Sequence, residues 1–261
     1  MKKLLIVLVA LLILGAIAVG VRTLGARDQT DKVDKKDAAE LVKKDDDATE
    51  GIEAGDRPEP GTYSYTGSGR ESVSVLGGSE HVFPEEIAFV VQLDPENACE
   101  WTSNVIYVKQ HVEERRYCSE GGNVTDLGFT RETEFFNQRQ KTVYECGEDA
   151  LRRKDAAAEG DTWSWTCSEG DKSTSKYTAK MLATETLTIG GEKVETAHTR
   201  VTSKQTGETR GTDTAEFWLD EKGLIVKFST DLKVKTKSIL GETEFIEKTE
   251  YELMSLVPDG E

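Results

Sequence analysis

Side chains that serve most catalytic and metal sites are scarce in this sequence. It has three histidines, His81, His111 and His198, and no two of them stand at the spacing of a metal site. His198 alternates with Arg200 on a polar strand face, so we expect it to be exposed. There is no Gly-x-Ser-x-Gly motif and no phosphate-binding loop, and the GSGRES stretch at Gly67 lacks the third glycine of a dinucleotide fingerprint. We therefore predict no catalytic residues, no cofactor and no metal, and a protein that is not an enzyme.

Positive charge is also in short supply. The 33 Lys and Arg residues are outnumbered by 49 Asp and Glu residues, which gives a formal net charge of −16 at pH 7. Because nucleic-acid binding requires clustered Lys and Arg to neutralise phosphates, this surface would repel a duplex. It would repel anionic lipid headgroups for the same reason. The composition thus excludes nucleic acid as a partner and indicates a well-solvated exterior.

Long hydrophobic runs are limited to one, near the amino terminus. Residues 4–21 are apolar throughout and follow Met1-Lys2-Lys3, which is the pattern of an export signal. A run of this length can just span a bilayer, so we expect residues 1–22 to form a membrane anchor with the lysines in the cytoplasm. The alternative is a signal peptide cleaved at Ala16-Ile17-Ala18, which would release the protein. No cysteine lies near the end of the run, so lipidation is not expected.

An acidic, polar stretch follows the hydrophobic run. Residues 23–60 include DKVDKKDAAELVKKDDD and end in GDRPEPG, a composition with too few apolar side chains to order itself. We predict an acidic disordered linker, with a short helix around residues 38–42 as its one candidate element. Asp45, Asp46 and Asp47 are consecutive rather than alternating, so they do not match a calcium loop.

From residue 61 onward the hydrophobic pattern has the two-residue period of strands with one wet face. In LIVKFSTDLKVKTKS, Leu224, Val226 and Phe228 alternate with polar residues. Similar runs, separated by turn residues, lie at 180–189, 194–203, 212–219 and 243–256. We predict an extracytoplasmic β domain at residues 61–258, with a tail at 259–261.

The predicted architecture is mainly β. The count of alternating runs predicts a curved antiparallel sheet or half-barrel of about ten strands, behind the amino-terminal transmembrane helix and the linker. Residues 87–93 are apolar on both faces, which is typical of a central strand. The GEDALRRKDAAAEG stretch at 147–160 is the one helix expected within the domain.

The chain has only four cysteines, Cys99, Cys118, Cys146 and Cys167. In an exported chain paired cysteines oxidise to disulfides, and four cysteines allow three connectivities. Cys99 and Cys118 close the ends of a stretch that resembles one β-hairpin, which favours a bridge between them and leaves Cys146 with Cys167. Zinc binding and redox chemistry are the alternatives, but the Cys-x-x-Cys spacing that either would favour does not occur.

The four tryptophans are candidates for a ligand-binding surface. Trp163 and Trp165 share one face of the predicted strand TWSWTC, Trp101 lies two residues after Cys99, and Trp218 lies in EFWLDEKGL. Aromatic side chains on one face of a sheet can line a cavity for a hydrophobic ligand. They can equally fill the core, and the sequence leaves both interpretations open.

Residues 185–229 resemble a known family. A strand, a Gly-Gly hairpin and a second strand precede FWLDEKGLIVKF, in which Trp218, Leu219, Asp220 and Gly223 stand in the order Trp-Leu-Asp and then a glycine turn. This succession resembles the bacterial lipoprotein-carrier fold of the periplasmic lipoprotein-localisation factors and the related mycobacterial envelope lipoproteins. The resemblance implies a strongly curved antiparallel sheet that holds a lipid or acyl chain on its concave face. The chain departs from that family in having no lipobox cysteine and in having two expected disulfides.

The exported part also resembles uncharacterised membrane-anchored envelope proteins of actinobacteria, through its PGTYSY start and its YEC and WSWTC cysteine contexts. That likeness implies no activity. We expect a non-enzymatic cell-envelope protein, single-pass with its carboxy-terminal domain outside the cytoplasm, or secreted if the signal is cleaved. It is expected to bind a lipid or other hydrophobic molecule on the concave face of its sheet. The alternative is an extracytoplasmic protein-interaction or structural module with a filled core.

Overall fold

The computed structural model describes residues 30–42, 53–238 and 241–259. These residues form one α-helix, one turn of 3-10 helix and a sheet of fourteen strands. The helical elements are α2 (Lys35–Val42) and η2 (Val75–Gly77). The strands are β1 (Gly61–Val73), β2 (Ser79–Val82), β3 (Glu86–Leu93), β4 (Glu100–Val108), β5 (His111–Glu120), β6 (Asn123–Phe135), β7 (Gln138–Cys146), β8 (Leu151–Arg153), β9 (Thr162–Glu169), β10 (Ser173–Ile189), β11 (Glu192–Gly207), β12 (Thr209–Leu219), β13 (Ile225–Ser238) and β14 (Gly241–Leu253).

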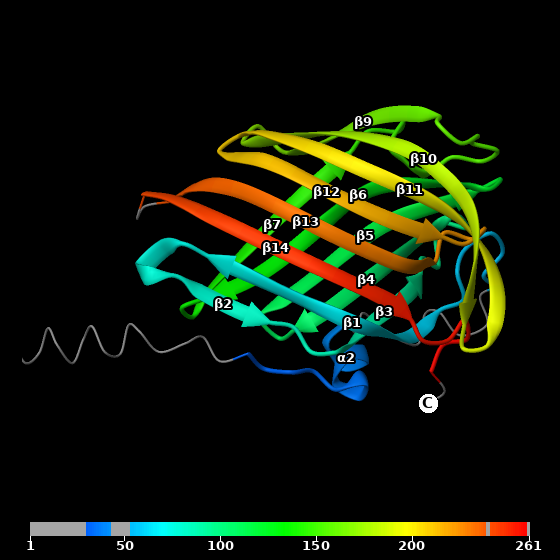
Figure 1. The fold of residues 1–261 in the computed structure, drawn as a ribbon, viewed down its shortest axis with the longest axis horizontal. Coiled ribbons are helices and arrows are strands. Elements are labelled where there is room, and N and C mark those ends of the chain that lie inside the picture. Colours follow the sequence, from blue (N-terminus) through cyan, green and yellow to red (C-terminus); the bar gives the residue numbers. More distant parts are fainter. Residues whose placement is uncertain (1–29, 43–52, 239–240, 260–261) are drawn as a thin grey trace, which may run out of the picture.

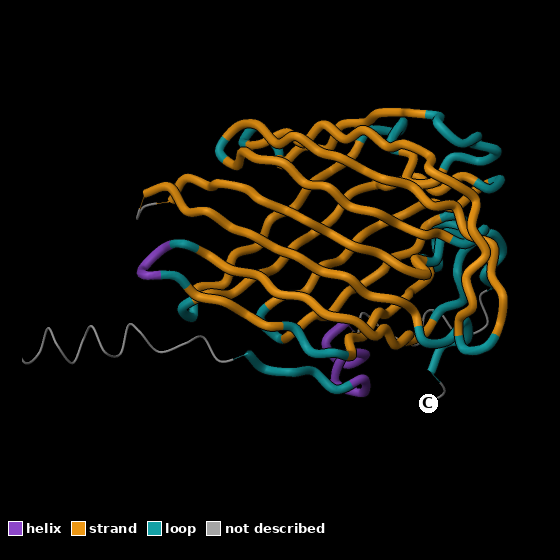
Figure 2. Tube along the Cα trace, in the orientation of Figure 1, coloured by secondary structure: helices purple, strands orange, loops and turns teal. Residues whose placement is uncertain are grey.

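The strands form one antiparallel sheet that closes into a barrel (Figures 1 and 2). Strands that are neighbours in the chain pair with each other almost throughout, and β14 then returns to pair with β1. Twelve of the described strands make up the ring, while β2 pairs with the second half of β1 and β8 pairs with β6. Closure removes most of the exposed edge that an open sheet would present.

The half-barrel of about ten strands expected from the hydrophobic period is therefore wrong in extent. The alternation of side chains shows which residues face inward, but it carries no information on whether the two outermost strands meet. That meeting depends on the pairing of Tyr65 with Leu253 and of Val73 with Phe245, which lie at opposite ends of the chain.

The alternation of apolar and polar side chains nevertheless predicts correctly which residues of a strand face the interior of the barrel. In β13, Leu232 and Val234 are buried inside, whereas Lys233 and Lys235 beside them are exposed to solvent. The inward side chains include a buried aromatic core, in which the rings of Tyr65 and Phe89 stack 4.0 Å apart. Other large members of this core are Tyr63, Trp101, Tyr117, Phe228 and Tyr251.

The segment expected to be a disordered linker includes α2, which packs on the outside of the barrel (Figure 1). Ala38 is fully buried in a second apolar cluster with Ala88, Val90 and Ile106. The helix thus covers the outer face of β3, which explains why residues 87–93 are apolar on both faces. The guanidinium of Arg57 is also buried and donates hydrogen bonds to backbone carbonyls of the loop between β3 and β4.

The predicted helix at 147–160 is wrong, because most of this stretch forms turns and residues 151–153 form β8. Arg152 is buried there and donates a 3.0 Å hydrogen bond to Asp126, so a tertiary ion pair overrides the local helix propensity. The predicted anchor or signal peptide at residues 1–22 lies outside the described residues. Among the residues that are described, no helix is long and apolar enough to cross a membrane.

Both predicted disulfides are confirmed, Cys99 with Cys118 and Cys146 with Cys167. Cys118 lies opposite Glu100 rather than opposite Cys99, so the first bridge is one residue out of register at the open end of the β4–β5 hairpin. The second bridge joins β7 to β9, where the two cysteines are directly opposed.

Candidate functional site

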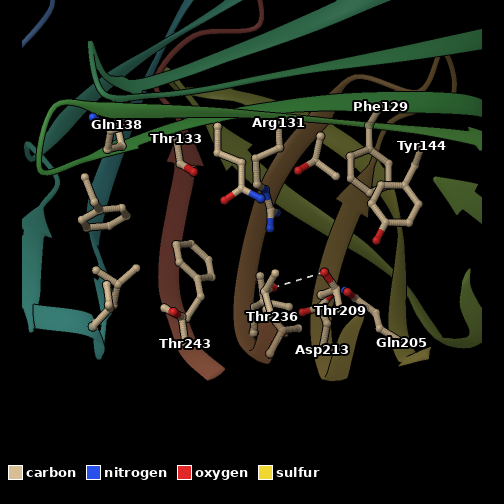
Figure 3. Close-up of a pocket in the computed structure, with 18 of the residues that line it drawn as sticks. Phe129, Arg131, Thr133, Gln138, Tyr144, Gln205, Thr209, Asp213, Thr236 and Thr243 are labelled. Carbon is tan, nitrogen blue, oxygen red and sulfur yellow. Dashed lines mark hydrogen bonds between the residues drawn. The ribbon is translucent and has the colours of Figure 1, made fainter. Parts of the chain in front are cut away.

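A pocket opens at the end of the barrel where four hairpins meet, those joining β1 to β2, β6 to β7, β11 to β12 and β13 to β14. Its volume is about 380 Å³. Figure 3 shows its side chains converging from the strands on both sides. The apolar lining comprises Val73, Val75, Leu76, Phe129, Phe135, Phe136, Tyr144, Tyr177, Leu232, Val234 and Phe245. The polar lining comprises Arg115, Arg131, Thr133, Gln138, Gln140, Thr142, Gln205, Thr209, Asp213, Thr236 and Thr243.

The inward face of β14 shows how the barrel is layered. Its residues run from Thr243 and Phe245 in the pocket, through the buried Glu247, to Tyr251 and Leu253 in the aromatic core. Charged side chains at the level of Glu247, among them Arg131 and Glu113, therefore separate the pocket from the filled part of the barrel. We call this layer the charged belt.

Two large apolar side chains at the mouth of the pocket sit on strained backbone. Leu76 has φ 53° in the β1–β2 connection and Phe136 has φ 54° in the β6–β7 turn. Both line the pocket, and Leu76 is 51% exposed. Residues with large side chains rarely adopt positive φ, and such strain concentrates at functional sites. Both strained positions therefore lie at the mouth of the pocket.

Arg131 and Arg115 form the floor of the pocket and share the buried carboxylate of Glu113. Arg131 lies 2.9 Å from Glu113 Oε2, and Arg115 lies 2.6 Å from Oε1. Burial alone would raise the pKa of Glu113, but the two guanidinium groups hold it well below its ordinary range. Arg115 also lies over the ring of Phe129, 4.6 Å from its centroid. Both cations are thus fixed in place by partners within the wall.

The ion pairs continue from Arg115 across the barrel wall. Asp126 lies 3.4 Å from Arg115 and 3.0 Å from Arg152, and the guanidinium of Arg152 lies 4.5 Å from the centroid of Phe217. Each buried charge in this branch therefore has an opposite charge within reach, as burial requires.

On the other side of the floor, Arg131 reaches Glu247 at 3.9 Å, and Glu247 faces His111 at 4.0 Å. Glu71 lies 2.8 Å from His111 and 2.7 Å from His81. Burial would raise the pKa of Glu71, but the two imidazoles outweigh it and lower the pKa to about 2. Burial would likewise lower the pKa of His111, yet Glu71 and Glu247 raise it.

Asp213 is the acidic group of the pocket lining. Its Oδ1 atom is buried without a hydrogen-bond partner. The pKa of Asp213 is raised from its ordinary value of 3.8 to about 7, because the carboxyl is enclosed and because Glu247 and Glu113 carry like charge nearby. The pocket floor can therefore gain or lose a proton near neutral pH.

None of the four tryptophans singled out in the sequence lines this pocket. Trp101 is buried in the core and donates a hydrogen bond to Ser119. Trp165 is buried opposite the pocket residue Tyr177, and their ring centroids lie 5.2 Å apart. Trp163 is partly buried and donates to the carbonyl of Leu151. The actual lining residues come from many strands, so no local sequence pattern brings them together.

Trp218 lies on the outside of the barrel and stacks 3.9 Å from His198. His198 lies 2.8 Å from Glu185 and 3.0 Å from Glu216, one carboxylate at each ring nitrogen. The expectation that His198 is exposed is wrong, because the ring of Trp218 stacks on it and its side chain is only 12% exposed. The cluster is a hydrogen-bonded network on the outer face of the barrel.

Comparison with known proteins gives little help with function. No protein-family model matches this chain, and no curated protein matches it. A solved structure, that of the hypothetical lipoprotein YmcC from Escherichia coli (K12), is similar over 86% of this chain and 99% of that chain, with 16% identity and a TM-score of 0.34.

Proposed function

We propose that this protein is a non-enzymatic, membrane-anchored envelope protein whose barrel binds a hydrophobic molecule in the pocket among the four hairpins. The observation that carries the proposal is the pocket itself. Its volume of about 380 Å³ lies within the range of small-molecule sites, and its aromatic and aliphatic walls suit an apolar ligand. A barrel with a filled interior would offer no such space.

The polar groups of the pocket suit a ligand with a polar end. Arg131 and Arg115 are fixed by Glu113 at the floor, and Asp213 there has an oxygen without a partner. Threonine and glutamine side chains line the walls nearer the mouth (Figure 3). An amphiphile, with an apolar body against the phenylalanines and a hydrogen-bonding group at one end, matches this division.

The location outside the cytoplasm is supported by two features. The hydrophobic run at residues 4–21 has the pattern of an export signal or anchor. Every cysteine of the described residues is in a disulfide, and disulfides persist in oxidising compartments. In this proposal the membrane is the partner of the amino-terminal segment, and the barrel stands outside the cytoplasm.

A second candidate is an extracytoplasmic protein-interaction module. The observation that favours it is β7, which pairs with β9 only at Glu145 and Cys146 among the described residues. The remainder of β7, residues 138–144, pairs with β6 on one side. An open strand edge can accept a strand from another protein. Cross-linking in cells that recovers a protein partner through this edge would favour the module.

Fluorescence titration with a dansyl-labelled fatty acid tests the ligand-binding proposal. The full chain is reconstituted in neutral lipid nanodiscs, together with T142W, which fills the pocket, and V143W, which places the same ring on the outer face of β7. The proposal predicts saturable binding to the wild type and to V143W, and binding at least about tenfold weaker to T142W. Equal binding by all three proteins, or none by the wild type, would overturn it.

A further inference from the structure

Three ionisable side chains from distant parts of the chain converge inside the barrel. They are Glu71 of β1, His111 of β5 and Glu247 of β14, and each offers a ligand atom within 4.8 Å of the others. We propose that they form a binding site for one divalent transition-metal ion. The site lies in the charged belt beyond the pocket and is independent of the proposed ligand.

The strand register places two carboxylates face to face. Glu71 and Glu247 are directly opposed on neighbouring strands, and their side chains are 0% and 1% exposed. Like charges directly opposed across strands destabilise a sheet, and burial away from water makes the repulsion stronger. His111 beside Glu71 and Arg131 beside Glu247 offset part of this repulsion, and a cation between the two carboxylates would offset more of it.

The polar atoms that face one another here lack hydrogen-bond partners. Oε2 of Glu71, Oε2 of Glu247 and both ring nitrogens of His111 are buried and unsatisfied. His111 Nδ1 lies 2.8 Å from Glu71 Oε2, yet the pair does not have the direction of a hydrogen bond. Most buried polar groups in proteins are paired, so several orphaned atoms in one cluster require an explanation. A metal ion held by one ring nitrogen of His111 and one oxygen of each glutamate supplies one.

The surroundings hold the three ligands in position. His81, directly opposite Glu71 on β2, makes a 2.7 Å hydrogen bond to its other carboxylate oxygen, Oε1. That bond turns Oε2 of Glu71 toward His111, as outer partners orient metal ligands elsewhere. The rings of Tyr107 and Phe83 pack beside His111, with centroids 4.9 and 5.7 Å away. The ligands are therefore fixed in a water-poor environment.

The ligand types identify the class of metal. One imidazole and two carboxylates suit Zn²⁺, Mn²⁺ or Fe²⁺. Ca²⁺ needs six to eight oxygens, and Mg²⁺ keeps several waters, so neither suits a dry site with three protein ligands.

The cluster at His198 provides an internal comparison. It also contains one histidine and two glutamates, and there too the carboxylates approach opposite ring nitrogens of the histidine. Both ring nitrogens of His198 make hydrogen bonds, however, whereas neither ring nitrogen of His111 does. The same three residue types thus form a hydrogen-bonded cluster outside the barrel and a coordination site inside it.

Metal analysis of the full chain tests this proposal. The protein is stripped with a chelator and exposed to Zn²⁺ or Mn²⁺ in turn, and the metal retained after gel filtration is measured. We expect one ion per wild-type chain, the same for H198N, and an affinity at least about 100-fold lower for H111N and E247Q. Retention by H111N and E247Q equal to that of the wild type would overturn the proposal.

A second measurement on the wild type alone covers the case in which the variants fail to fold. Co²⁺ added to the metal-free chain should raise the melting temperature and produce visible absorption bands of a site with nitrogen and oxygen ligands. If Zn²⁺, Mn²⁺ and Co²⁺ up to about 1 mM leave melting and absorption unchanged, the site does not bind metal.

Discussion

Cys146 of β7 lies directly opposite Cys167 of β9, at one of only two positions where these strands pair in the described part of the chain. Elsewhere in the ring, neighbouring strands share longer ladders; β4 and β5, for example, pair from Glu100 to His111. The disulfide therefore joins the two neighbouring strands of the ring that pair over the fewest residues, and we call this β7–β9 junction the seam. Tyr144, two residues before Cys146, lines the pocket.

Removing this disulfide should cost more stability than removing the other one. The two bridges close chain segments of similar length, with sequence separations of 21 and 19, so each should contribute about 3 kcal/mol through chain entropy. C146S/C167S should lose additional free energy of unfolding, because β7 and β9 share only two paired positions. Denaturant unfolding should show a larger decrease for this variant than for the matched C99S/C118S. Equal losses would show that the seam is held by other contacts.

The sequence predicted the strands well where each has one wet face, as in β13. It also predicted the pairing of Cys99 with Cys118, because a hairpin brings its own ends together. It could not predict that Val73 would pair with Phe245, since closure depends on the length and twist of every strand between them. At 147–160 the local pattern favoured a helix, and the buried ion pair of Arg152 with Asp126 decided otherwise.

Substitution of Glu113 should reduce the stability of the barrel more than substitution of a charged residue on its surface. Glu113 pairs with both Arg115 and Arg131, and E113Q would leave these two partly buried guanidinium groups with only the longer contacts to Asp126 and Glu247. Loss of one member of a buried ion pair costs about 3–5 kcal/mol. The control is E145Q, which removes the partner of Arg116 at the surface and should cost less than about 1 kcal/mol. Urea unfolding of both variants distinguishes them, and similar losses would contradict the assignment.

Asp213 should make the barrel less stable as the pH rises. Its pKa is about 7 in the folded protein against an ordinary 3.8, so between these values the folded state binds more protons than the unfolded chain. Stability then falls with rising pH, by up to about 1.4 kcal/mol per pH unit within that window. D213N should make this dependence less steep and be more stable than the wild type at pH 8.

The control for this titration is D231N, which changes an exposed aspartate paired with Lys248 on the outer face of the barrel. It should leave the pH dependence as it is in the wild type. Unfolding midpoints measured from pH 4 to pH 8 would contradict the account if D213N and the wild type kept the same slope.

Phe136 should show opposite effects on stability and on binding. F136G relieves the positive φ of this turn position, which should stabilise the protein by about 1 kcal/mol. The same change removes an aromatic wall of the pocket and should weaken ligand binding. Thermal unfolding and fluorescence titration of one preparation measure both. A variant that loses stability and keeps its binding would show that the ring serves the fold.

The site itself was largely beyond sequence reasoning. The four tryptophans were the most conspicuous aromatic residues, but the pocket is lined by phenylalanines and tyrosines from several strands. Arg131 and Glu113 are unremarkable in a chain this rich in charge, and only the closed barrel places them together. His111 and Glu71 were likewise too far apart in the chain for spacing to connect them.

The central claim is that the pocket holds a hydrophobic molecule, and native mass spectrometry of the full chain after mild extraction from its own cells tests it most directly. The account predicts a population carrying one small apolar ligand, which is lost in T142W and retained in V143W. Ligand-free wild-type protein that also takes up no acyl probe would contradict it and would favour the protein-interaction module.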